Sequence, residues 1–523
     1  MHDSEKASPP SPQMSTPASV KDANPNVNVN AQPIKPAMLN SDSEKGLPSS
    51  TQVLATAPAP INADAERRLV RKIDLHVYPI LFLVYALSFL DRINISNARI
   101  QGLTEDLDLY GNRFNIALFV YFIPYVLLEV PSNMIIKKMR PSYYLASLMA
   151  AWGIVNMCMG FVKSYEGLVV LRFFLGVLEA GVMPGIIYLT SMYYKRHEFQ
   201  KRMSFYFCSV LAAGAFGGLL AYGISHLDGH RGLRAWRWIF IIEGAATAFI
   251  SIVSVFLIVD WPDQCRFLNT EEKQLLRLRL ADDGTELARM DTLNRYAYKL
   301  IFSDWKIWLG SLVYMGIGIT GYSTVYFMPT ILLEFGWTAE AAQLHTVPVY
   351  VVTAVGMLGA AYLSDRFKHR YGFIMLGAAI ATIGYAMLLN QANLSRDAKY
   401  TAIFLASIGG YMGTPIALAW LTNNISGHWK RAFGSGIQIT IGNCAGIIAA
   451  NIFVTQESPR YPTGYGTALG LTWLGALAAT LLVVYLALEN RKRAAGEGDG
   501  RLSQPKEELD NMGDYHPSFQ FTL

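Results

Sequence analysis

The chain has 523 residues, of which 52% are hydrophobic and only 16% are charged. This balance is too apolar for an ordinary soluble protein of that length and predicts an integral membrane protein. The net charge of +5 is small and its lysines and arginines lie in short clusters, which favours a fixed orientation in a membrane over nucleic-acid binding. The four cysteines have no paired spacing, so neither a disulfide framework nor a metal site is expected.

The chain begins with a polar stretch, residues 1–65, that is rich in Ser, Pro, Asn and Ala and contains no aromatic residue. Such a composition cannot bury enough apolar surface to fold, so we expect a disordered cytosolic tail. No apolar run in it is long enough for a signal peptide. A charged lead at 66–72 then precedes the first long apolar segment, 75–97, which we expect to act as its own membrane signal.

Eleven further apolar segments of about 20 residues follow, which predicts an all-α membrane protein with twelve transmembrane helices. They lie near 114–136, 142–162, 168–191, 203–226, 237–259, 308–333, 345–364, 371–390, 399–422, 432–455 and 467–488. The one long polar segment, 260–305, separates two six-helix halves, 66–259 and 306–490, and a polar tail follows at 491–523. Equal halves are typical of a duplicated transporter fold. Within the linker, Thr270 is expected to cap a short helix that lies along the membrane surface.

Basic residues gather in alternate loops, which sets the predicted orientation. Both termini and the linker should be cytosolic because positive loops stay on that side, and the expected location is the plasma membrane. One loop opposes the rule and carries three arginines on the outer side. The predicted cytosolic clusters include Lys137, Lys138 and Arg140; Lys195, Arg196, Lys201 and Arg202; Arg366, Lys368 and Arg370; Lys430 and Arg431; and Arg491, Lys492 and Arg493.

The fourth apolar segment carries two opposite charges, Arg172 and Glu179. Residues seven apart on a helix lie on nearly the same face, about 10 Å apart along its axis. A charge near the bilayer centre costs at least about 2.5–3.5 kcal/mol, so such residues usually line a cavity or a binding site. The alternative is an ion pair that only holds helices together. Pro184, flanked by glycines, predicts a bend just beyond Glu179.

Two further charges, Asp91 and Arg92, lie about fifteen residues into the first helix. With the predicted orientation, they reach a depth similar to that of Arg172. We therefore expect Asp91, Arg92, Arg172 and Glu179 to form one charged column in the N-terminal half. Because Asp91 and Arg92 point about 100° apart, one of them is open to a purely structural role.

The C-terminal half has no equivalent charges and offers neutral polar and aromatic side chains in its central segments. Together with the charged column, they would hold an anion between charge on one side and ring faces on the other. Packing alone is the alternative for each aromatic residue. Glu129 is expected near the inner end of the second helix, paired with loop cations, and Glu243 is expected to be structural. The candidates are Tyr322, Ser323, Tyr326, Tyr411, Trp420 and Asn443.

Three stretches carry a family resemblance: ALSFLDRINISNA at 86–98, LRFFLGVLEAGVMPG at 171–185 and the linker opening WPDQCRFLNTEEK. They resemble the anion:cation symporter branch of the major facilitator superfamily. The runs GLRAWRWIFIIEG and YYKRHEFQKR are similar to the fungal allantoate permease-like group, whose members carry organic acids such as nicotinate, pantothenate, biotin or allantoate. The resemblance spans about residues 66–490.

The resemblance also implies roles for single residues. It assigns arginines to the substrate anion, here Arg92 and Arg172, and acids to protons, here Glu179 and Asp91. Substrate contacts are implied for Tyr125 and Asn443, with Tyr322 and Tyr326 added from their position. The loop signature of the superfamily survives only in part, in YLSDRFKHR, which implies a gating role for Asp365 and Arg366. Pro184 is expected to transmit a bend to the inner gate.

These observations predict a secondary transporter that takes up a small organic anion with protons and works as a monomer. No GxxxxGK[ST] run points to a nucleotide-driven pump, and no nucleophile or metal constellation points to an enzyme, so no cofactor is expected. Two alternatives remain open. The same charges would suit an exporter of an acidic metabolite, or a non-transporting nutrient sensor of the same fold.

Overall fold

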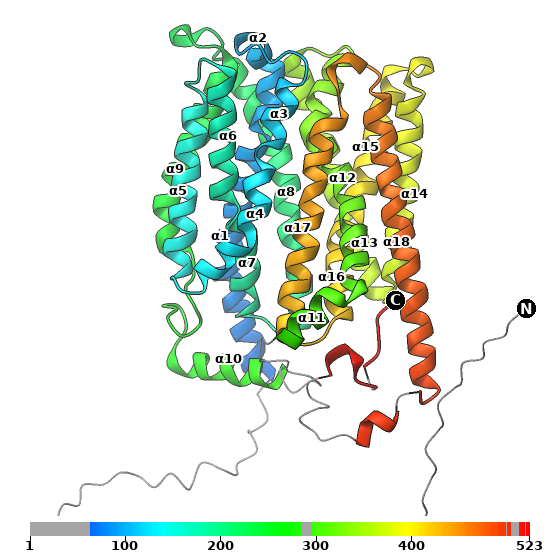
Figure 1. Ribbon diagram of the computed structural model, residues 1–523. Coiled ribbons are helices and arrows are strands. Elements are labelled where there is room, and N and C mark those ends of the chain that lie inside the picture. The colour runs from blue at the N-terminus through cyan, green and yellow to red at the C-terminus, as the bar shows by residue number, and fades with distance from the viewer. Residues whose placement is uncertain (1–62, 284–294, 498, 504–511, 518) are drawn as a thin grey trace, which may run out of the picture. The chain divides into compact units, whose positions relative to one another are not determined.

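The computed structural model describes residues 63–283, 295–497, 499–503, 512–517 and 519–523 (Figure 1). The predicted disordered tail at 1–65 lies almost wholly outside these residues. Within them the chain is a bundle of long helices, as the apolar segments predict. Helices suit this setting because the bilayer core offers no water to satisfy the backbone, and a helix bonds its N–H and C=O groups within the segment.

The N-terminal half contains the first six spans, three of them interrupted. The first span is kinked between α1 and α2, within Arg99–Leu103, where Gln101 and Gly102 leave the helical conformation. The second is built from α3 and α4, and the fourth from α6 and α7. The bounds are α1 Ala63–Ala98, α2 Thr104–Asp106, α3 Arg113–Phe119, α4 Phe122–Ile136, α5 Pro141–Met159, α6 Tyr165–Glu179, α7 Val182–Ser191, α8 Arg196–Ser225 and α9 Ala235–Leu257.

The C-terminal half repeats this plan after the linker helices α10, Thr270–Asp283, and α11, Arg295–Ser303. Its fourth span is again interrupted, between α15 and α16. The bounds are α12 Trp305–Glu334, α13 Ala339–Phe367, α14 Arg370–Leu389, α15 Arg396–Met412, α16 Thr414–Asn424, α17 His428–Ile452 and α18 Pro462–Ala494. Among the described residues, eleven helices are long and apolar enough to cross a membrane, and α5 is the twelfth at the predicted position, which confirms the predicted fold class.

Hydroxyl side chains set where several spans begin. Ser164, Thr338 and Ser395 each accept a hydrogen bond from the backbone N–H three residues later, at 3.3, 3.2 and 3.3 Å. Each bond satisfies one of the N–H groups that the first turn of a helix leaves without an internal partner. The polar loops therefore determine the starts of α6, α13 and α15, and the apolar runs determine their lengths.

The linker helix α10 lies beside the start of α1, at the end of the bundle that we call the tail end because α11 and the C-terminal residues also lie there (Figure 1). Glu272 accepts from the backbone N–H of Asn269 at 2.8 Å and from Lys72 of α1 at 2.7 Å. The buried Arg279 bonds Glu66 of α1 at 2.7 Å and pairs with Glu198 of α8. The linker is thus fastened to the N-terminal half by charge.

The two halves meet closely at the opposite end of the bundle, the far end. Among the described residues, three hydrogen bonds join the halves there. Gln101 donates to Gln343 at 3.0 Å, and Asn115 donates to the carbonyl of Phe453 at 3.2 Å. In the third, Thr455 donates to the Gly111 carbonyl at 3.5 Å. The far end is therefore closed in this conformation.

Glycines allow the tightest helix contacts. A Cβ added at Gly244 of α9 would lie 2.3 Å from the backbone nitrogen of Met157 in α5, and one added at Gly153 of α5 would lie 2.7 Å from the nitrogen of Ala248. Small residues let membrane helices approach each other this closely, which strengthens their van der Waals contact. The α5–α9 pair therefore depends on having no side chain at these two positions.

We expect Gly244→Ala to lower the melting temperature, because the added methyl group has to push α5 and α9 apart at a cost of about 1–3 kcal/mol. Gly223→Ala on α8 is the matched control, since a Cβ there meets nothing within 4 Å. The melting temperatures of the two detergent-solubilised variants are measured by heating samples and quantifying the remaining folded protein by size-exclusion chromatography. Equal melting temperatures for the two variants would contradict the packing account.

Candidate functional site

An ion pair between α1 and α6 lies at the centre of the N-terminal half. Glu179, the last residue of α6, accepts from Arg92 of α1 at 3.1 Å and is fully buried. The same carboxylate oxygen, Oε2, also accepts from the hydroxyls of Ser88 at 3.0 Å and Tyr121 at 2.8 Å. The other oxygen, Oε1, has no donor among the described residues. One oxygen of Glu179 is thus crowded with donors and the other is open.

The guanidinium of Arg92 is held by aromatic rings as well as by Glu179. Its central carbon lies 4.7 Å from the ring centre of Phe89, 5.0 Å from Tyr121 and 4.9 Å from Tyr125. Ring faces attract a cation, and the attraction grows where water is excluded. Arg92 therefore keeps favourable contacts even when its carboxylate partner is neutral.

Arg172 lies next to this pair, as the predicted depths require. Its Nη1 donates to the backbone carbonyl of Arg92 at 3.1 Å, whereas Nε and Nη2 have no hydrogen-bond acceptor among the described residues. The side chain is 1% exposed. A buried guanidinium with two unused donors is suited to a planar anion such as a carboxylate.

Asp91 does not join the predicted column and turns instead toward α5 and α9. It accepts from Asn156 at 2.6 Å, Trp152 at 3.1 Å and Thr247 at 2.8 Å. Three neutral donors around one carboxylate hold α1 against two neighbouring helices. The structure therefore brings together Arg92, Arg172 and Glu179 and gives Asp91 a separate set of partners. This agrees with the angle of about 100° between neighbouring side chains on a helix, which turns Asp91 away from Arg92.

The C-terminal half faces the ion pair with aromatic and amide groups, as predicted. Tyr322 of α12 donates to Asn443 of α17 at 2.7 Å, and its ring stacks on that of Tyr326 at 6.0 Å. Phe122 of α4 meets the edges of both rings across the interface between the halves, at 5.3 and 6.1 Å. Trp420, by contrast, lies away from this group, since its indole N–H donates to the carbonyl of Thr522.

A cavity lies between the halves beside Arg92. Its free volume is about 70 Å³, well below the 300–1,000 Å³ typical of ligand pockets, so this conformation is constricted. Of the predicted substrate contacts, Arg92, Tyr125, Tyr322 and Asn443 line it, and Arg172 and Tyr326 do not. The remaining lining residues are Tyr85, Phe89, Met183, Phe207, Val210, Tyr314, Gly318, Gly321, Tyr411, Thr414, Ile439 and Gly442.

The predicted gating residues lie at helix interruptions and loops. α6 ends at Glu179 and α7 begins at Val182, so the interruption falls where the prediction based on Pro184 places the bend. Asp365, near the end of α13, pairs with Arg370 at 3.1 Å, and Arg366 is exposed. The gating roles of these residues stay predictions.

The prediction that Glu129 pairs with loop cations is wrong. Glu129 is 3% exposed, and its carboxylate accepts from Thr440 of α17 at 3.1 Å, which links the two halves one helical turn from Tyr125. The residue count placed it near a loop, but α4 packs against α17 there, so a hydroxyl of the other half is nearer than any loop. Sequence reasoning also missed Ser88 and Tyr121, which lie one turn before Arg92 and Tyr125 on the same helix faces.

Comparisons with known proteins place this geometry among transporters. The sequence profile described as Major Facilitator Superfamily matches residues 81–450. The chain is 33% identical to the MFS-type transporter cnsO of Penicillium expansum, over 88% of this chain and 91% of that protein. It is 30% identical to the high-affinity nicotinic acid transporter of Saccharomyces cerevisiae, over 92% and 90%. The solved structure of a D-xylose–proton symporter matches with a TM-score of 0.58 at 15% identity, over 77% and 96%.

The ion pair generates a stability prediction. Arg92→Gln leaves the Glu179 carboxylate buried without its cation, which should cost about 3–5 kcal/mol. Adding Glu179→Gln should recover much of this loss, because neither charge then remains. Glu166→Gln, an exposed carboxylate on the same helix, serves as the control and should change little. Melting temperatures of the single and double variants test the coupling, and losses that simply add would refute it.

Proposed function

The chain belongs to the Major Facilitator Superfamily of membrane transporters, and on that basis we propose that it is a secondary carrier for uptake of a small organic anion together with protons. The observation that carries the proposal is the cavity lined by Arg92. The buried guanidinium of Arg92 donates to Glu179, and aromatic side chains line the rest of the cavity. A planar carboxylate fits both surfaces. We place the carrier in the plasma membrane with its tail end in the cytosol.

The proposed coupling of proton and anion binding follows from competition between the Glu179 carboxylate and the substrate carboxylate for Arg92. When Glu179 is ionised, its carboxylate occupies the guanidinium that the substrate needs. A proton on Oε1 would displace none of the bonds made to Oε2, and it would neutralise Glu179, leaving the charge of Arg92 available to the substrate carboxylate. The proton therefore has to bind for the anion to bind well, which is the requirement of a symporter. Asp91 remains the proposed second acid.

The substrate class is proposed from the charge and the aromatic lining. One relative is named for nicotinic acid, a planar aromatic carboxylic acid, so nicotinate is the first substrate to test. Uptake by purified protein in liposomes, with radiolabelled nicotinate and unlabelled carboxylates as competitors, gives a direct answer. Stimulation by an acid exterior supports proton symport. Binding of carboxylates without any transport would favour the sensor over the carrier.

We expect Arg172→Lys to reduce uptake efficiency by about ten- to a hundredfold, because lysine keeps the charge but loses the planar, two-pronged donor. The measurement is kcat/KM for uptake at equal protein content in the membrane. Arg231→Lys, an exposed arginine at the far end, should leave the value unchanged. Normal kinetics in Arg172→Ala would remove Arg172 from the substrate site.

We expect Glu179→Gln to abolish accumulation driven by a pH gradient while keeping exchange of substrate down its own gradient. The amide is a permanent mimic of the protonated acid, so Arg92 stays available at every pH. In the unmodified protein, substrate affinity should fall as pH rises, because the ionised Glu179 competes for Arg92, and in the variant it should not depend on pH. If accumulation in Glu179→Gln still follows the pH gradient, Glu179 does not carry the coupling proton.

A further inference from the structure

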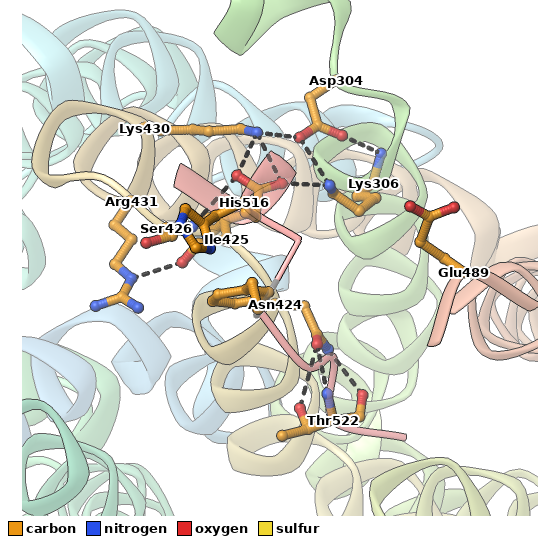
Figure 2. A network of polar contacts seen from close by, with 12 residues as sticks. Asp304, Lys306, Asn424, Ile425, Ser426, Lys430, Arg431, Glu489, His516 and Thr522 are labelled. Carbon is orange, nitrogen blue, oxygen red and sulfur yellow. Dashed lines mark hydrogen bonds and ion pairs between the residues drawn. The ribbon is translucent and has the colours of Figure 1, made fainter. Parts of the chain in front are cut away.

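The C-terminal residues of the chain are held in a built site at the tail end of the C-terminal half. In Figure 2 the side chain of Lys430 points toward Asp304 and toward the short helix Gly513–Tyr515, which carries Asp514. Lys430 contacts the two oxygens of Asp514 at 2.7 and 3.0 Å and Asp304 at 2.5 Å. Lys306 contacts Asp304 at 3.3 Å and also pairs with Asp514.

This group of two lysines and two aspartates is neutral and buried, since each of the four residues is at most 3% exposed. Burial disfavours ionisation of Asp514, but the two ammonium groups hold the pKa of its carboxyl below the usual range. Asp514 is the only member that comes from the C-terminal segment, and without it two buried lysines would share one carboxylate. The site is therefore specific for an anionic group.

The backbone of the last residues is recognised as well. Asn424, the last residue of α16, accepts from the N–H of Thr522 at 2.8 Å and donates to its carbonyl at 3.0 Å (Figure 2). Asn490 of α18 makes the same pair of bonds to Phe521, both at 2.9 Å. Arg493 donates to the carbonyls of Asp514, His516 and Phe519 at 3.0, 3.3 and 2.6 Å.

One short helix, α16, connects the C-terminal segment with the cavity. α16 has eleven residues; its first, Thr414, lines the cavity, and its last, Asn424, holds Thr522. α15 ends at Met412 and α16 begins at Thr414, so the single residue Gly413 separates the two helices. The C-terminal segment ties the other end of α16 to α12, α17 and α18.

We propose that the tail end of the C-terminal half is a peptide-binding site whose ligand is the chain's own C-terminal segment, residues 512–523, of which the structure describes 512–517 and 519–523, and that docking of this segment restrains α16. The ligand class is an acidic peptide with an extended end and a buried aromatic anchor, Phe521. Release of the segment frees α16 to move about Gly413. This inference is independent of which substrate the carrier takes.

Hydrogen–deuterium exchange of the full chain tests the restraint. Thr522→Pro removes the N–H that bonds to Asn424, so exchange within residues 414–424 should quicken by up to about tenfold. Thr522→Val keeps that N–H and should leave exchange unchanged. Residues 182–191 of α7, in the N-terminal half, should exchange alike in all three proteins and report intact folding. Unchanged exchange of α16 in Thr522→Pro would overturn the restraint.

A synthetic peptide of residues 512–523 with a fluorescent label tests the site itself. We expect saturable binding to the full chain carrying Asp514→Lys, whose own segment is expelled by the added positive charge, and at least about tenfold weaker binding to the unmodified chain, whose site is occupied. A peptide carrying the same Asp514→Lys change should not bind. Two results would overturn the site. One is that the Asp514→Lys chain elutes as folded protein but does not bind the unmodified peptide. The other is that the unmodified and Asp514→Lys peptides bind equally well.

Discussion

A charge inside an apolar bundle has to be neutralised, and the ion pair between Arg92 and Glu179 meets that constraint at the centre of the N-terminal half. It joins α1 to α6, and through Tyr121 it also reaches α4. Arg172 donates to the backbone carbonyl of Arg92, so the second cation is held beside the ion pair. The positions of Arg92, Arg172 and Glu179 are therefore coupled to one another.

The asymmetry between the halves gives the site its chemistry. The N-terminal half supplies charge, whereas the C-terminal half supplies the stacked rings of Tyr322 and Tyr326 and the amide of Asn443. An anion bound between them would meet attraction from one side and hydrogen bonds and ring faces from the other. The constricted cavity and the closed far end fit a carrier in which substrate entry requires relative movement of the halves.

Each half also contains a span broken in the middle, α6–α7 in one and α15–α16 in the other. Both breaks lie next to the cavity region, after Glu179 and at Gly413. The segments that follow the breaks are short: α7 has ten residues and α16 has eleven. The last residue of α16 contacts the C-terminal segment, which links the end of the chain to the wall of the cavity.

The amino-acid sequence by itself determined the twelve spans, the linker and the interruption after Glu179, because the bilayer imposes segment length and apolar composition locally. It also pointed to Arg92, Arg172 and Glu179, since buried charges stand out in apolar runs. Only the tertiary structure decided which partner each charge takes: Asp91 turned to Asn156, Glu129 to Thr440, and Asp514 to two lysines more than 80 residues away. Such pairings depend on helix rotation and packing between distant segments, which residue spacing along one helix does not contain.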